Sequence, residues 1–266
     1  MTTALNPMRM AIGQLNMQWS SEKNLAGMLN AMALAAEQGA SLCSFPELAV
    51  TGLHRQVPAL AKPELISRCL EEMQASCVRH SMAVAFGAPT FGGDGAIFNS
   101  HLFFGETGTC EGLIEKEGLT DAEATFFARG SSRPVMILKG QRCSAVICRE
   151  IDDFDRVCSQ LPAGTTDLVF WPGSMRPDPE KPVQDPPEHV VKAQNLAQKL
   201  RSYVIQANWP NALNRPEEGE HTGHSAVIAP DGRLLFRLPK AESGLAVFNL
   251  GESEYEWHAE DTWAVA

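Results

Sequence analysis

The sequence alternates between short apolar segments and longer amphipathic ones, and this alternation constrains the fold more than any other feature. Apolar runs typical of β-strands cover residues 8–15, 41–47, 82–89, 98–104 and 110–116. Between the first three runs, residues 22–38 and 63–80 place their apolar side chains three and four positions apart, which is the spacing of an amphipathic helix. Gly39 is placed to end the first helix, and Pro63 suits the first turn of the second. The predicted order is β-α-β-α-β-β-β.

The second half of the chain repeats this order, although the sequences differ. Strands are predicted at residues 144–148, 167–171, 203–207, 225–229 and 245–250, and helices after Cys148 and across residues 187–201. In each half, strands alternate with helices early and follow one another later, so a mixed sheet with helices on one face is the expected unit. Two such units would bury their open faces against each other. We therefore expect an α/β fold, a four-layer α-β-β-α sandwich.

Size and charge limit the kinds of partner that we expect this chain to bind. It has 266 residues, 44% of them hydrophobic, and no linker or low-complexity stretch, so we expect one domain over residues 1–266. A formal net charge of −10 argues against binding nucleic acid and favours a small-molecule ligand. No apolar run approaches the roughly 18 residues that span a bilayer, and the N-terminus MTTALNPMRM lacks a signal-peptide pattern. We expect no membrane partner and a cytoplasmic location.

The cysteines do not indicate a disulfide framework or a metal site. Their number is odd, seven, and no secretion signal accompanies them, so most are expected to be reduced. There is no CxxC pair and no HExxH motif. Cys69 and Cys77 fall on the apolar face of a predicted helix and Cys43 within a strand, positions typical of buried structural thiols.

Three predicted strands end in a side chain that can do chemistry. Glu47 ends the run SLCSFPE, Lys116 ends CEGLIEK, and Cys148 ends SAVIC. Ligand crevices form at strand ends, where loops are freed from the core yet held by it, so these residues are candidates for one site. Each also has a simpler interpretation taken singly: Glu47 as a helix-start carboxylate, Lys116 as a solvated charge, and Cys148 as a core thiol.

A carboxylate, an ammonium and a thiol together could form a nucleophilic site. The thiolate is the reactive form of cysteine, whose ordinary pKa is about 8.5. A helix beginning after Cys148 and a nearby Lys116 would favour the thiolate, while Glu47 could take the proton when substrate arrives. Lys116 and a backbone N–H could then hold the oxyanion of a tetrahedral intermediate, an effect worth roughly 3–4 kcal/mol per donor.

The surroundings of these residues follow a known pattern. Glu47 lies in GASLCSFPELAVTG, Asn99 in IFNSHLFFGETG just before Lys116, and Cys148 in AVICREIDDF. The segments EATFFARG and GHSAVIAPDGR complete a series in the same order over nearly the whole chain. Together they resemble the nitrilase, or carbon-nitrogen hydrolase, superfamily, and most closely its amidase-like branch.

The resemblance implies a nitrilase-type sandwich with a Glu-Lys-Cys triad and no metal or organic cofactor. By position, Glu47 is expected to be the general base, Lys116 the oxyanion stabiliser and Cys148 the nucleophile. Glu123 falls where many members have a second glutamate that orients the lysine and the substrate; the alternative is an exposed carboxylate beside Asp121. The family attacks amide, carbamoyl or nitrile carbon and releases ammonia or an amine through a thioester. Its members usually form dimers, so we expect a homodimer or higher homo-oligomer.

Three segments depart from the family pattern. Many amidase branches read Tyr-Arg-Lys-x-His-Leu around the lysine, whereas this chain reads IEKEGL, which leaves substrate recognition open. The helix before VIQANW reads LAQKL where Arg-Ala-x-Glu-Asn is usual. Arg149 stands where Tyr, Trp, Glu or His is commoner. Arg149 is therefore a candidate for binding an anionic substrate, with a solvated arginine at a helix start as the equal alternative.

These observations predict a hydrolase of a small linear amide. A nitrile or N-carbamoyl hydrolase is the closest alternative, although the chain has no long extension beyond Ala266 of the kind seen in filament-forming nitrilases. A non-catalytic small-molecule-binding protein that kept the pocket is the alternative of another class. Loops at residues 53–61 and 171–187, the latter with Arg176 and Lys181, are expected to line the pocket.

Overall fold

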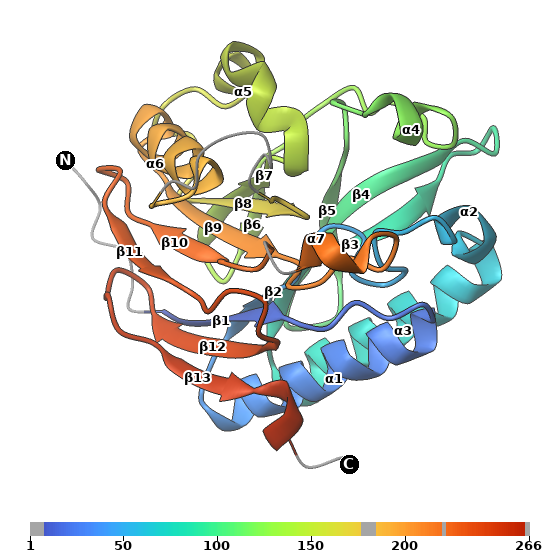
Figure 1. Cartoon of the computed structure of the whole chain (residues 1–266), viewed down its shortest axis with the longest axis horizontal. Helices are drawn as coiled ribbons and strands as arrows, with labels where there is room; N and C mark the ends of the chain where they lie inside the picture. The colour runs from blue at the N-terminus through green and yellow to red at the C-terminus, as the bar shows by residue number, and fades with distance from the viewer. Residues whose placement is uncertain (1–7, 177–184, 220–221, 264–266) are drawn as a thin grey trace.

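The computed structural model describes residues 8–176, 185–219 and 222–263, which contain two β-sheets flanked by helices (Figure 1). In the described part of the chain, the first sheet has seven strands in the order β13-β12-β1-β2-β3-β4-β5. They are β1 (Arg9–Gln14), β2 (Leu42–Ser44), β3 (Ala83–Phe91), β4 (Ile97–Phe104), β5 (Cys110–Glu115), β12 (Gly244–Asn249) and β13 (Glu256–Ala259). β1, β2 and β3 are parallel, and the other neighbours pair antiparallel.

The second sheet has, over the same described ranges, six strands in the order β11-β10-β9-β8-β7-β6. They are β6 (Met136–Leu138), β7 (Gln141–Ala145), β8 (Leu168–Gly173), β9 (Tyr203–Asn208), β10 (Ala226–Ile228) and β11 (Leu234–Arg237). The three central strands β7, β8 and β9 run parallel to one another. Their carboxyl ends therefore meet at one edge of the sheet, where ligands bind in many α/β proteins.

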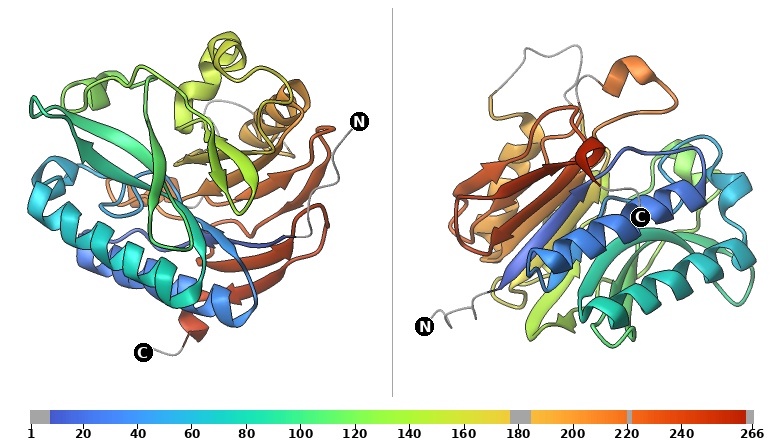
Figure 2. Two further views of the ribbon diagram at one scale, coloured as in Figure 1. Left: turned by 180° about the vertical axis from the view of Figure 1, so that it is seen from behind. Right: turned by 90° about the horizontal axis from the view of Figure 1, so that it is seen from below.

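Helices cover the outer face of each sheet. Helices α1 (Ser21–Glu37) and α3 (Pro63–His80) pack on the first sheet, and α5 (Phe154–Gln160) and α6 (Glu188–Leu200) pack on the second (Figure 2). Shorter helical turns lie in the loops: α2 (Val57–Leu60), α4 (Asp121–Ala124), α7 (Pro216–Gly219), η1 (Cys148–Asp153) and η2 (Glu260–Thr262). The predicted bounds of α3 are confirmed, and α1 and α6 each begin and end one residue from the predicted bounds.

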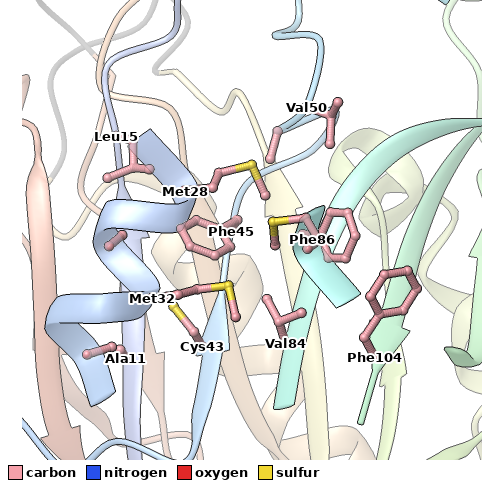
Figure 3. Packing of buried hydrophobic residues seen from close by; sticks show 14 of the residues in the cluster. Ala11, Leu15, Met28, Met32, Cys43, Phe45, Val50, Val84, Phe86 and Phe104 are labelled. Carbon is pink, nitrogen blue, oxygen red and sulfur yellow. The ribbon is translucent and has the colours of Figure 1, made fainter. Parts of the chain in front are cut away.

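Three apolar layers hold the sandwich together. Met28 and Met32 of α1 pack against Phe45 in the layer between helices and first sheet (Figure 3). Phe103 of the first sheet meets Phe170 of the second in the central layer, with ring centroids 5.8 Å apart. A third layer fills the space between the second sheet and its helices. The expected four-layer α-β-β-α sandwich is confirmed, because each sheet buries one face on helices and the other on its partner sheet.

The division of the chain into two self-contained halves is wrong. The strand expected at residues 245–250 is β12, and it pairs antiparallel with β1 in the first sheet, with Arg9 opposite Asn249 and Gln14 opposite Gly244. β13 then adds to the outer side of β12. The physical reason is that β1 would otherwise be an apolar edge strand with unpaired backbone groups. The C-terminal strands therefore complete the N-terminal sheet.

Several strand bounds also differ from the prediction. The strand expected at residues 144–148 is β7 and ends at Ala145, and Cys148 instead begins the 3-10 helix η1. The strand expected at residues 41–47 ends at Ser44, three residues before Glu47. β6, β11 and β13 were not predicted, because each has only three or four residues and too little alternation to be recognised. Within the described ranges, no helix has both the length and the apolar character needed to cross a bilayer.

Candidate active site

The structure brings together the three reactive side chains predicted from the strand ends. Glu47 follows β2, Lys116 follows β5 directly, and Cys148 follows β7, so the first two come from one sheet and the thiol from the other. All three line one cavity of about 450 Å³. Glu123, from the short helix α4, lines the same cavity.

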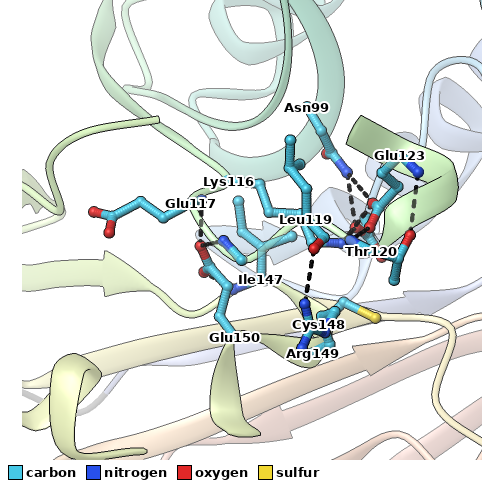
Figure 4. Close-up of polar contacts among 12 residues, drawn as sticks. Asn99, Lys116, Glu117, Leu119, Thr120, Glu123, Ile147, Cys148, Arg149 and Glu150 are labelled. Carbon is cyan, nitrogen blue, oxygen red and sulfur yellow. Dashed lines mark hydrogen bonds and ion pairs between the residues drawn. The ribbon is translucent and has the colours of Figure 1, made fainter. Parts of the chain in front are cut away.

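Lys116 lies between two carboxylates (Figure 4). Its Nζ is 2.6 Å from Glu47 Oε1 and 2.6 Å from Glu123 Oε1, and its side chain is 1% exposed. Asn99 Nδ2 donates to the same two oxygens, at 2.8 Å to Glu47 and 3.2 Å to Glu123. The other oxygen of Glu123 accepts the Thr120 N–H at 2.8 Å. Glu123 is therefore held within the site, and the alternative of a carboxylate exposed beside Asp121 is wrong.

Burial and mutual charge set the protonation of this group. Burial acts to lower the pKa of Lys116, but the neighbouring Glu47 and Glu123 carboxylates outweigh it and raise that pKa, so the ammonium stays charged. Burial acts to raise the pKa of Glu123, and the Lys116 ammonium outweighs it, which leaves Glu123 ionised. Glu47 differs, because burial raises its pKa despite the pairing with Lys116.

Glu47 keeps one oxygen available for proton transfer. Its Oε1 accepts from Lys116 and Asn99. Its Oε2 is buried and has no hydrogen-bond partner among the described residues. A carboxyl with a raised pKa and an unused oxygen is suited to accept a proton from a nearby thiol or water.

The backbone of Cys148 is in the left-handed region, at φ 50°. A non-glycine residue there is strained by about 1–3 kcal/mol and persists only when its neighbours hold it. Trp171 Nε1 donates to the Cys148 carbonyl at 2.8 Å. Gly173 allows β8 to pass close by, because a Cβ at this position would lie 3.3 Å from the Cys148 Cα. The sharp turn separates the cysteine from the strand and places it at the cavity.

The thiol itself is neutral at rest. Burial, reinforced by the Glu47 charge, raises the pKa of Cys148 to about 12, although Lys116 and the Ser174 backbone N–H act to lower it. Lys116 therefore favours the thiolate, as the sequence indicated, but desolvation of the sulfur is the larger effect and raises the net pKa. Such a thiol can act as a nucleophile only if a base removes its proton.

The main chain of Glu47 is held by residues that sequence reasoning missed. Trp209 Nε1 donates to the Glu47 carbonyl at 2.9 Å. Gly87 lies so close that a Cβ there would be 2.1 Å from the Leu48 nitrogen. Trp171 has the equivalent role at Cys148. The only sequence signal was a tryptophan near the end of each of two neighbouring predicted strands, which by itself indicates core packing as readily as a site.

One nitrogen of the Arg149 guanidinium makes a contact within the protein. Its Nη1 donates to the Leu119 carbonyl at 2.7 Å, which ties the turn at Cys148 to the loop after Lys116. Arg149 also lines a second cavity of about 340 Å³, which adjoins Cys148 and includes Arg176 and Lys192. The structure therefore places Arg149 beside the site, and its contact with substrate stays a prediction.

The expected loops contribute to the cavity in part. Leu53 and Arg176 line it, as do Met17, Leu213 and Arg215, which were not predicted. Lys181 lies outside the described residues. Cys43, Cys69 and Cys77 are buried in the apolar layers, as the sequence indicated.

Residues 8–176, 185–219 and 222–263 contain no cluster of side chains typical of a metal site. No group of three or more His, Cys, Asp or Glu side chains over those ranges is arranged to hold a metal ion. The expectation that the protein uses no metal or organic cofactor stays a prediction.

Comparison with known proteins gives matches over most of this chain. The profile described as carbon-nitrogen hydrolase matches residues 9–258. A curated protein described as a probable nitrilase, from Schizosaccharomyces pombe, is 24% identical over 154 residues, which are 58% of this chain and 53% of that protein. The chain thus spans about half the length of that relative.

Solved structures share the fold at low identity. An amidase from Nesterenkonia sp. has a TM-score of 0.78 with 24% identity and covers 91% of this chain and 90% of its own. A double mutant of the amidase from Nesterenkonia sp. AN1 in complex with acrylamide has a TM-score of 0.80 with 22% identity, over 96% and 95% of the two chains. A glutamine-dependent NAD+ synthetase from Acinetobacter baumannii matches 94% of this chain but 47% of its own, with a TM-score of 0.78 and 21% identity.

Proposed function

The chain belongs to the carbon-nitrogen hydrolase family, and we therefore propose that it hydrolyses the C–N bond of a small, non-peptide amide through a thioester on Cys148. The observation that carries this proposal is the convergence of Glu47, Lys116 and Cys148 on one cavity. A base, a fixed cation and a nucleophile are the groups that cysteine-based acyl transfer requires.

In the first step, the Cys148 sulfur attacks the amide carbon and its proton passes to Glu47. The raised pKa of the thiol makes this base necessary, and the unpartnered Oε2 of Glu47 is the oxygen we assign to it. As the C–S bond forms, the carbonyl electron pair moves onto oxygen. Lys116 donates to this oxyanion, and Glu123 keeps the ammonium in position by its ion pair.

In the second step, the intermediate collapses and the C–N bond breaks. Glu47 returns the proton to the nitrogen, so ammonia or an amine leaves and a thioester remains on Cys148. Water then attacks the thioester carbon while Glu47 takes a proton from it. The C–S bond breaks, the sulfur regains a proton, and the carboxylic acid is released.

The cavity supports a short amide as substrate. Its walls include the apolar side chains of Met17, Leu53 and Leu213, which suit a small acyl chain. Among the structural neighbours, the Nesterenkonia amidase has been solved in complex with acrylamide and with butyramide. Nitriles and N-carbamoyl compounds present a similar carbon to the thiol and are the alternative substrates. A non-catalytic protein that binds such molecules is the alternative of another class.

Ammonia release from a panel of amides, nitriles and N-carbamoyl compounds tests the proposal, with Cys148→Ala as the control. We expect turnover of short amides to fall at least about 10⁴-fold in the variant. The circular dichroism spectrum and the unfolding transition should stay close to those of the wild type. Turnover that persists in folded Cys148→Ala protein would refute the thioester mechanism, and its absence in wild type across the panel would favour the binding protein.

We propose a single domain over residues 1–266, a homodimer or higher homo-oligomer, and a cytoplasmic location. Sedimentation of the purified protein measures the second of these directly.

A further inference from the structure

Glu150 is a buried carboxylate that the proposed mechanism does not use. It lies two residues after Cys148 in η1 and is 2% exposed. A buried carboxylate is unfavourable unless hydrogen bonds and a counter-charge compensate the loss of water. The contacts of Glu150 supply both, and they connect the two parts of the site.

One oxygen of Glu150 holds the segment that follows the lysine. Its Oε1 accepts the Glu117 N–H at 2.6 Å and the Gly118 N–H at 3.2 Å (Figure 4). Those amides come immediately after Lys116, which directly follows β5 of the first sheet. This oxygen therefore fixes the main chain directly after Lys116.

The other oxygen holds the segment that precedes the nucleophile. Its Oε2 accepts the Ile147 N–H at 2.6 Å, directly before Cys148. The Arg133 guanidinium lies 3.0 Å from the same oxygen and also donates to the carbonyl of Ala145, the last residue of β7. The Arg133 guanidinium thus balances the charge of the carboxylate close to Cys148, just after the end of β7.

We propose that Glu150 is a positioning residue that sets the distance between the Cys148 thiol and the Lys116 ammonium. Lys116 and Cys148 belong to different sheets, and this one side chain bonds the main chain next to each of them. The proposal rests on the proposed function of the site, because it assigns Glu150 the task of aligning the nucleophile with the oxyanion donor.

The contact between Glu150 and the segment after Lys116 also requires a glycine at position 118. A Cβ at this position would lie 2.9 Å from the Glu150 Cγ and 3.3 Å from its Cα. A methyl group there must push the carboxylate away from the amides it accepts. Gly118→Ala therefore loosens the same connection without removing the charge, and it provides a variant independent of Glu150→Gln.

Glu150→Gln keeps the size of the side chain but replaces one acceptor oxygen with an NH₂ group. Both oxygens face donors, so one end of the connection must be lost. Because a misplacement of about 1 Å can reduce an enzymatic rate about 10²-fold, we expect kcat to fall roughly 10- to 100-fold with KM within about threefold. Gly118→Ala should change kcat in the same direction by a smaller factor.

Asp167→Asn provides a matched control. Asp167 also accepts several hydrogen bonds, from the backbone and guanidinium of Arg142, at the opposite end of β7 from the cysteine. Its loss removes a carboxylate contact from the same strand but leaves the nucleophile turn alone. We expect a lower unfolding temperature for this variant and wild-type kcat per folded molecule.

The experiment measures kcat, KM and the unfolding temperature for the full chain and the three variants. It also measures the rate at which iodoacetamide alkylates Cys148, read from its own peptide by mass spectrometry because Cys110 is exposed as well. Alkylation joins the sulfur to the reagent carbon, releases iodide and sends the thiol proton to solvent, so it needs no substrate. We expect slower alkylation of Cys148 in Glu150→Gln and Gly118→Ala than in wild type and Asp167→Asn.

Wild-type kcat and alkylation rate in both site variants, with only the unfolding temperature lowered, would overturn the proposal and make Glu150 merely structural. If Glu150→Gln does not fold, Gly118→Ala decides between these outcomes alone. If the wild type turns over no compound in the panel, the proposed function fails, and the alkylation rates still decide whether Glu150 positions the thiol.

Discussion

The two sheets hold their reactive groups in different ways. On the first sheet, Glu47, Lys116 and Glu123 fix one another through buried ion pairs between side chains. On the second, Cys148 is fixed through its main chain, by a left-handed turn and by the Trp171 bond to its carbonyl. The proposed acid-base part of the site is therefore organised by charge, and the proposed nucleophile by backbone geometry. Substitutions that alter charge and those that alter the backbone should affect different parts of the reaction.

Among the substitutions that test this comparison, removal of the Glu47 charge should have the largest effect on turnover. Glu47→Gln keeps the shape of the side chain but cannot accept the thiol proton, so we expect kcat to fall about 10³-fold. Ammonia release from the best substrate measures it, and thermal unfolding shows whether the loss of the Lys116 ion pair affects the fold. A kcat within tenfold of wild type would remove Glu47 from the role of base.

Glu47→Gln should also lower the pKa of Cys148, which lies on the other sheet. The Glu47 charge helps to raise the pKa of Cys148 to about 12, so its alkylation by iodoacetamide in wild type should still be increasing with pH well above the ordinary cysteine value of about 8.5. Removing a negative charge favours the thiolate. The alkylation profile of Glu47→Gln should therefore move to lower pH, and an unchanged profile would show that the two parts do not interact through charge.

A pair of tryptophan substitutions compares how the main chain is held at Cys148 and at Glu47. Trp171→Phe removes the bond to the Cys148 carbonyl, and Trp209→Phe removes the matching bond to Glu47. Each lost bond is worth about 0.5–1.5 kcal/mol. We expect kcat to fall about tenfold for Trp171→Phe, because the strained turn depends on it. For Trp209→Phe we expect a change within about threefold, because Lys116 and Asn99 still hold the Glu47 side chain. The reverse order of kcat values would contradict the comparison.

Local sequence pattern predicted those parts of the fold that depend on nearby residues. The apolar face of α3, with Ile66, Cys69 and Met73, follows helical spacing from its first turn to its last, and its bounds were correct. The pairing of β12 with β1 was not predicted, because the sequence separation is almost the length of the chain and neither strand specifies its partner locally. Cys148 was assigned to a strand because its left-handed turn has no glycine to mark it.

The candidate site was predicted through motifs, and its supporting contacts were not. Glu47, Lys116 and Cys148 each stand in a recognisable segment. Glu150 could not be recognised, because a glutamate in the polar run CREIDD is usually solvated and no serine or threonine precedes it as in the usual capping box. Its burial depends on Arg133 and Gly118, which lie far away in sequence and near only in the folded chain.

The pairing of β1 with β12 has a consequence for how the protein is made. During synthesis the first strand leaves the ribosome long before its antiparallel neighbour exists. The edge of β1 that pairs with β12 stays without its strand partner until the segment up to Asn249 has emerged. The Glu47 and Lys116 segments belong to this sheet, so the site should form only after the β12 segment has left the ribosome.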